Sequence, residues 1–252
     1  MSNILTTHVG SLPRSKELSE FLFAKDKGEK FSQSSFDEVL KNNVESVVKK
    51  QLDVGIDFVS DGEMSKISYA TYIKDRIDGF SGESERRAPA DLDDFPEYKE
   101  KIAKSGGTPT YTRPCCTNEL KVKDETSLLQ DINNFKNSLD KLNHRHAFMN
   151  SASPGVINVF MPNKFYSTED EYLDKLSNIM AKEYELITKS DIQVQLDCPD
   201  LALARHMNFK NLSEDEFIKR AELQIECLNS ALSNVDVEQT RMHICWGNYE
   251  GP

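Results

Sequence analysis

Residues 168–200 read TEDEYLDKLSNIMAKEYELITKSDIQVQLDCPD, and the fold class follows from this stretch. Thr168 and Glu171 have the spacing of a helix N-terminal capping box, and the apolar residues after them recur every three or four positions. Residues 192–196 then alternate in the manner of a strand, which ends at the polar residue Asp197. An amphipathic helix that leads into a buried strand is the repeating unit of a parallel α/β sheet.

The same alternation recurs on both sides of this stretch. Further capping boxes at Ser35 and Ser213 each predict the start of a helix. The helix that begins at Ser35 stops at Gly55. The predicted strands are 4–9, 56–60, a segment within 110–122, 147–152, 192–196 and 242–246. The predicted helices are 15–24, 35–54, 127–142, 168–187 and 213–232.

This order predicts an α/β fold, and we expect a (β/α)8 TIM-type barrel that is truncated after its sixth strand. A barrel needs eight strand–helix units, whereas the sequence stops at Pro252, directly after the sixth predicted strand. We therefore expect a single barrel domain over residues 1–252 that is incomplete at its C-terminus. The polar and charged residues at about 81–107 predict a long excursion within that domain, not a boundary between two domains.

The composition excludes several classes of protein. The chain of 252 residues has 31 Lys and Arg against 42 Asp and Glu, a net charge of −11, which argues against nucleic-acid binding. No apolar run approaches the ~20 residues of a membrane helix, and no secretory signal begins the chain, so a cytoplasmic location is expected. Five irregularly spaced cysteines favour reduced thiols or metal ligands over a disulfide framework.

The segment His243-Ile244-Cys245 is the clearest candidate for a metal site. Two residues that are two positions apart on a strand point to the same face, so an imidazole and a thiolate would meet on one side of the sheet. Together they would form half of a zinc site. The alternative is a hydrogen-bonded histidine and a packed thiol in the interior.

The other candidate site residues also lie at predicted strand ends, where parallel α/β proteins build their sites. Asp61 and Glu63 could hold a substrate ammonium group or act in proton transfer, although a solvated acidic turn would explain the same pattern. The side chain of Asp197 should emerge at the mouth of the sheet, unless it is a helix N-cap. His8 is either an inward polar residue or a core histidine. The backbone N–H groups of Gly10 and Ser11 could bind a carboxylate.

Four segments at four successive strand ends together resemble the cobalamin-independent methionine synthase family. They are TTHVGSLPR at 6–14, SDGE at 60–63, QLDCPD at 195–200 and HICWGNYEGP at 243–252. The resemblance covers essentially the whole chain and favours the short, single-barrel members. It implies a (β/α)8 barrel, with zinc held by His243 and Cys245 together with a Glu and a Cys on two further strands. It also implies that homocysteine is bound by Gly10, Ser11, Glu63 and Asp197.

The function implied by the resemblance is zinc-dependent transfer of a methyl group from methyltetrahydrofolate, a folate methyl donor, to homocysteine. Zinc would deprotonate the thiol, whose ordinary pKa is near ~8.5, and so make it nucleophilic. Cys198 departs from the family's Asp-Glu-Pro motif, which leaves the thiol and the donor open. The alternatives are a zinc thiol alkyltransferase that uses an epoxide or coenzyme M, and a non-catalytic barrel fragment. A small-molecule thiol and a methyl donor are the expected partners, and the chain could form a homo-oligomer.

Overall fold

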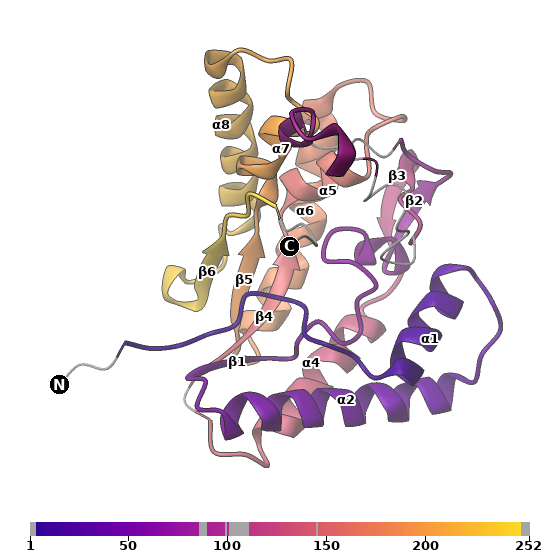
Figure 1. Ribbon diagram of the computed structural model, residues 1–252, viewed down its shortest axis with the longest axis vertical. Coiled ribbons are helices and arrows are strands. Elements are labelled where there is room, and N and C mark those ends of the chain that lie inside the picture. Colours follow the sequence, from indigo (N-terminus) through magenta and orange to yellow (C-terminus); the bar gives the residue numbers. More distant parts are fainter. Residues whose placement is uncertain (1–3, 86–89, 99, 101–110, 145, 248–252) are drawn as a thin grey trace.

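A parallel sheet lies at the centre of the computed structural model, which describes residues 4–85, 90–98, 100, 111–144 and 146–247 (Figure 1). The sheet has four strands in the order β1-β4-β5-β6, and every neighbouring pair is parallel. Its strands are β1 (Phe58–Ser60), β4 (His146–Ala152), β5 (Gln193–Asp197) and β6 (Thr240–His243). Each strand is joined to the next in the sheet by a helical crossover, as parallel pairing requires.

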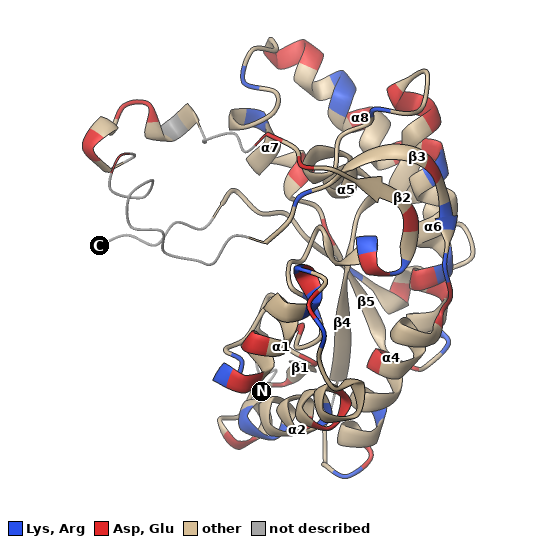
Figure 2. Ribbon diagram, turned by 90° about the vertical axis from the view of Figure 1, so that its right-hand side faces the viewer, with Lys and Arg blue, Asp and Glu red and all other residues tan. Residues whose placement is uncertain are grey.

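Four long helices pack side by side in chain order along the sheet (Figure 2). They are α2 (Gln33–Asp53), α4 (Thr126–Leu139), α6 (Glu169–Thr188) and α8 (Glu214–Ala231). The shorter helices are α1 (Lys16–Asp26), α5 (Pro154–Phe160) and α7 (Leu203–His206). The 3-10 turns within the described ranges are η1 (Tyr72–Asp75), η2 (Ala90–Leu92), η3 (Pro199–Leu201) and η4 (Val237–Gln239).

The two faces of the sheet differ in chemistry because successive strand residues point to opposite sides. Val59, Met149 and Val194 are buried in the apolar core. The opposite face carries two polar rows that the strand register aligns. Asn150, Gln195 and Arg241 form one row, and Ala152, Asp197 and His243 form the next row toward the carboxyl ends. The polar face can therefore present several side chains to one site.

The helix and strand predictions from residues 126 to 232 agree with the structure to within a few residues. Thr168 caps α6 by accepting a hydrogen bond from the Glu171 N–H group at 3.1 Å. Ser213 and Glu216 form the predicted capping box of α8. The strands predicted at 147–152 and 192–196 are β4 and β5. The short helix α5 was not predicted, although Ser153 caps it and Pro154 occupies its first turn.

Several predicted elements at the N-terminal side need correction. The predicted strand 4–9 is not a strand, because it pairs with β1 through one bridge between Thr7 and Phe58. The N-cap of α2 is Ser32 in place of Ser35, since the helix already begins at Gln33. The predicted strand 242–246 is shifted, and β6 ends at His243.

The third predicted strand pairs differently from what was expected. It is β3 (Cys115–Val122), which forms an antiparallel hairpin with β2 (Ile77–Ser81) apart from the parallel sheet (Figure 1). The hairpin lies in the connection between β1 and β4. Local alternation identified a strand here but carried no information about its partner.

The structure confirms an α/β fold with a parallel sheet. The polar excursion expected at about 81–107 falls partly outside the described residues, which include 81–85, 90–98 and 100 of that range. Among the described helices, none combines the length and the apolar character that crossing a membrane would take.

Candidate functional site

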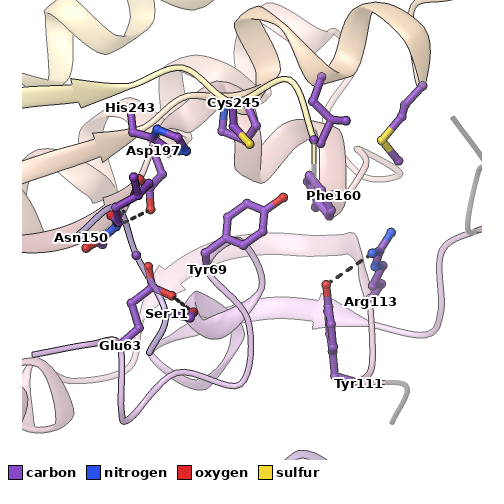
Figure 3. Close-up of a pocket in the computed structure, with 16 residues that line it drawn as sticks. Ser11, Glu63, Tyr69, Tyr111, Arg113, Asn150, Phe160, Asp197, His243 and Cys245 are labelled. Atoms are coloured by element: carbon purple, nitrogen blue, oxygen red, sulfur yellow. Dashed lines mark hydrogen bonds between the residues drawn. The ribbon is translucent and has the colours of Figure 1, made fainter. Parts of the chain in front are cut away.

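A cavity of about 650 Å³ lies at the carboxyl ends of the strands (Figure 3). One side is polar and is lined by Gly10, Ser11, Glu63, Asn150, Asp197, His243 and Cys245. The other side is formed by Tyr111, Arg113, Phe160 and Met207. Tyr69 stands between the two sides in Figure 3, and its ring meets that of Phe160 edge to face at 5.6 Å. The site is thus one chamber with two chemically different walls.

Most of the site residues proposed from the sequence line this cavity, although they come from four separate segments of the chain. Gly10 and Ser11, Glu63, Asp197, and the pair His243 and Cys245 all belong to its lining. His8 is half-buried and does not belong to it. The structure therefore brings together every proposed residue except His8.

Glu63 occupies a conformation that side chains other than glycine rarely adopt. Its φ is 55°, directly after Gly62 with φ of 64°, so two successive residues are left-handed. The carboxylate is 1% exposed and accepts a hydrogen bond from the Ser11 hydroxyl. Burial raises the pKa of Glu63, and the nearby Lys66 ammonium opposes that rise. Strain and a buried charge at one residue are typical of functional sites.

Asp197 ends β5 and is held by two side-chain amides. Asn150 Nδ2 donates to its two carboxylate oxygens at 3.3 and 3.0 Å, and Gln195 Nε2 donates at 3.1 Å. Burial raises the pKa of Asp197, whereas these hydrogen bonds favour the ionised form and lower it. The amides orient the carboxylate and compensate for part of its desolvation.

The loop with Gly10 and Ser11 lies against the acidic turn that carries Glu63. The Leu12 N–H group donates to the Gly62 carbonyl at 3.1 Å, which fixes the distance between the two segments. A Cβ at Gly10 would lie 3.1 Å from Glu63 Oε1, so a side chain there would crowd the carboxylate. Within the described part of the chain, the backbone N–H groups of Gly10 and Ser11 have no hydrogen-bond acceptor. They can accept an anionic ligand.

Lys66 is a buried cation that interacts with the acidic groups of the site. Its ammonium donates to the backbone carbonyl of Asn150 and lies 4.2 Å from the centre of the Tyr72 ring. Its charge favours ionisation of Asp61, Glu63 and Asp197. Lys66 therefore offsets part of the negative charge behind the cavity.

His243 and Cys245 both line the cavity, but they are not consecutive same-face residues of one strand as predicted. β6 ends at His243, and Cys245 follows in an irregular segment. An imidazole and a thiol suit zinc, which takes four ligands. Across the described ranges of the chain, no three His, Cys, Asp or Glu side chains gather as a metal-binding group. The donor set fits two of the four positions of a zinc site.

Cys198, the departure from the family motif, lies outside the cavity. Its thiol is fully buried and donates to the Leu196 carbonyl at 3.6 Å. Burial, with Asp200 nearby, raises the pKa of this thiol far above its ordinary value. Cys198 is accordingly a packed thiol without access to substrate.

Several polar and aromatic residues at the site were not proposed from the sequence. They are Tyr69, Tyr111, Arg113, Asn150 and Gln195. Asn150 lies on a correctly predicted strand, and alternation from Asp197 would have placed Gln195 on the same face as that carboxylate. Tyr69 and Arg113 follow no local pattern, because their place depends on the β2–β3 hairpin and its connections.

Comparisons with known proteins agree with the resemblance seen in the sequence. The family model described as the catalytic domain of the cobalamin-independent synthase matches residues 4–89. A methionine synthase from Sulfolobus acidocaldarius is 25% identical over 245 residues, which make up 97% of this chain and 62% of that protein. A 5-methyltetrahydropteroyltriglutamate–homocysteine methyltransferase from Bifidobacterium longum is 32% identical over 75 residues, 30% of this chain and 10% of that protein.

A solved structure has a similar fold. The B12-independent methionine synthase from Shewanella sp. W3-18-1, in complex with selenomethionine, aligns with a TM-score of 0.63 at 16% identity. The alignment covers 87% of this chain and 55% of that chain. The chain spans about 62% of the length of the methionine synthases that it matches.

Proposed function

We propose that this chain, a relative of the cobalamin-independent methionine synthases along most of its length, forms the homocysteine-binding part of a methyltransferase that makes methionine. One observation carries the proposal. Two buried carboxylates, Glu63 and Asp197, share a cavity with the N–H groups of Gly10 and Ser11, for which the described residues supply no acceptor. Carboxylates suit an ammonium group and N–H donors suit a carboxylate, so the polar wall is complementary to an α-amino acid.

The binding mode follows from these charges. The substrate ammonium would lie between Glu63 and Asp197, and it would favour the ionised form of both buried acids. The substrate carboxylate would accept hydrogen bonds from the Gly10 and Ser11 backbone. With both ends held, the thiol side chain would extend toward the side of the cavity that His243 and Cys245 line. This arrangement would orient the sulfur toward a second substrate in the same chamber.

We further propose that His243 and Cys245 are two of the ligands of a zinc ion and that the remaining ligands lie outside the described residues. Bound zinc would supply Lewis acidity, which holds a thiol as its thiolate at neutral pH. Burial lowers the pKa of His243, so its ring is neutral and has a lone pair available for a metal. His8 precedes the cavity-lining Val9 in the chain and stays a candidate for substrate binding.

The second wall suits a flat methyl donor of the folate type. Arg113 places its guanidinium 4.9 Å from the centre of the Phe160 ring, and Tyr111 accepts a hydrogen bond from that guanidinium at 3.3 Å. Aromatic rings and a fixed cation are complementary to a planar group that carries carboxylates. We place the donor here, with Tyr69 between it and the thiol. The parallel sheet would then be part of a (β/α)8 barrel in which this chain is one continuous domain.

Titration of the zinc-loaded chain with homocysteine and with coenzyme M tests the proposal. We expect homocysteine to bind more tightly, because coenzyme M has no ammonium group for Glu63 and Asp197. Tighter binding of the sulfonate would instead favour the related thiol alkyltransferases. A second titration with homocysteine after Asp197→Asn should show a loss of about tenfold or more in affinity, the effect of a lost charged hydrogen bond.

A further inference from the structure

The segment that carries Gly10 and Ser11 has little backbone pairing with the sheet. It is joined to β1 at one bridge, between Thr7 and Phe58, with Thr6 and Asp57 hydrogen-bonded beside it. Beyond that bridge, the Val9 carbonyl is tied to the sheet by side chains. The Leu12 N–H group holds the Gly10–Ser11 loop to Gly62, whereas its position relative to β4 and β5 depends on the side chains that reach Val9.

Two amide side chains make this connection. Asn150 and Gln195 are direct register partners on β4 and β5. Asn150 Nδ2 donates to the Val9 carbonyl at 3.0 Å, and Gln195 Nε2 donates to the same carbonyl at 2.5 Å. The same two nitrogens donate to the Asp197 carboxylate. We call Asn150 and Gln195 the amide pair.

The orientation of the amide pair is determined by its partners. A backbone carbonyl and a carboxylate only accept hydrogen bonds, so each amide must turn its nitrogen toward them. Asn150 Oδ1 is consequently buried without a hydrogen-bond partner among the residues that the structure describes, in a side chain that is 2% exposed. An unpaired buried acceptor is unfavourable for folding. Stability of the fold alone therefore does not explain why an amide with an unpaired oxygen is buried here.

We propose that the amide pair consists of positioning residues that set the distance between the Gly10–Ser11 backbone and the Asp197 carboxylate. In the proposed function, on which this inference rests, these two groups bind the carboxylate and the ammonium of the substrate. Because both ends of an α-amino acid are attached to one carbon, their separation is fixed. A site with the matching separation selects α-amino acids over ligands that have only one of the two charges.

The test compares methionine with its deamino analogue, which lacks the ammonium group, by calorimetric titration. Wild-type chain should bind methionine about tenfold or more tightly than the analogue. In Asn150→Leu and in Gln195→Met, this ratio should fall close to one, because the analogue uses only one end of the site. Gln193→Met is the matched control: it removes an amide from the same face of β5, where Gln193 donates to the Glu238 carbonyl, and should keep the wild-type ratio.

The outcomes separate this inference from the proposed function. If wild-type chain does not bind methionine, the proposed function fails and the inference falls with it. The inference alone is wrong if the wild-type chain prefers methionine and the folded amide-pair variants keep that preference. It is also wrong if these variants lose affinity for methionine and for the analogue by the same factor. Should Asn150→Leu not fold, Gln195→Met gives the same comparison, and Asn150→Ser keeps the volume change at the buried site small.

Discussion

The Asp200 carboxylate occupies the space in which a side chain at Gly155 would begin. A Cβ built on Gly155 would lie 2.1 Å from Asp200 Oδ2, and the other carboxylate oxygen accepts a hydrogen bond from the Ser153 hydroxyl at 2.8 Å. The contact joins the first turn of α5 to η3, whose Pro199 lines the cavity. The close packing of Gly155 against Asp200 thus requires that residue 155 have no side chain.

Gly155→Ala should destabilise the protein by about 1 to 3 kcal/mol, the usual range for overpacking a buried contact. Urea unfolding measures this free energy. In an Asp200→Ser background, Gly155→Ala should lower the free energy of unfolding by clearly less, because the shorter side chain leaves room for the methyl group. Equal costs in both backgrounds would show that the strain arises elsewhere.

Asp61→Asn should stabilise the protein more at pH 7 than at pH 4. Burial raises the pKa of Asp61 from 3.8 to about 6, with Lys66 opposing the rise. Between these values the unfolded chain has lost the proton that the native state retains, so stability falls as the pH rises from about 4 to about 6. The asparagine does not titrate, so at pH 7 the variant's free energy of unfolding should exceed that of the wild type by roughly 2 to 3 kcal/mol. Urea unfolding at several pH values checks this, and a gain independent of pH would contradict it.

Glu63→Gln and Glu63→Gly should both weaken methionine binding about tenfold or more while raising the melting temperature. The first variant removes a buried charge, and the second also relieves the left-handed φ of 55°. Glu63→Gly should therefore be the more stable of the two. Calorimetry and thermal unfolding measure the two effects. A variant that loses both stability and binding would mean that Glu63 is a structural residue.

Arg76→Met should destabilise the protein by about 3 to 5 kcal/mol, because it leaves buried acids without their cation. Arg76 pairs with Glu183 at 2.8 Å and with Asp131, and all three side chains are almost fully buried. Lys49→Met is the control, since it removes the exposed Lys49–Asp53 pair and should change stability by less than about 1 kcal/mol. Urea unfolding of the two variants should differ accordingly.

Zinc should bind the chain weakly, because the proposed site has only His243 and Cys245 as ligands and no third His, Cys, Asp or Glu of the described residues gathers with them. Competition with a chromophoric chelator should give an affinity weaker than about micromolar, and Cys245→Ser and His243→Asn should each weaken it further. A zinc content near one per chain that withstands a chelator would show that other residues complete the site.

The amino-acid sequence alone determined the four long helices to within a few residues and the strands β4 and β5. The caps at Thr168 and Ser213 and the alternation in β5 depend on neighbours within one or two turns, so they can be recognised without the fold. The motifs at strand ends also indicated Glu63, Asp197, His243 and Cys245, because the carboxyl ends of parallel strands meet at one edge of a sheet.

The tertiary structure alone decided which segments pair and which side chains meet. The pairing of β2 with β3, the single bridge made by the predicted strand 4–9 and the contacts of Asn150 with Val9 and Asp197 all join distant residues. Alternation of apolar and polar residues shows that a segment can form a strand, but it does not show which strand will be its partner. The edge of any β-strand offers the same backbone donors and acceptors. The partner is selected by strand register and by packing across the whole sheet, and neither can be predicted from a local sequence pattern.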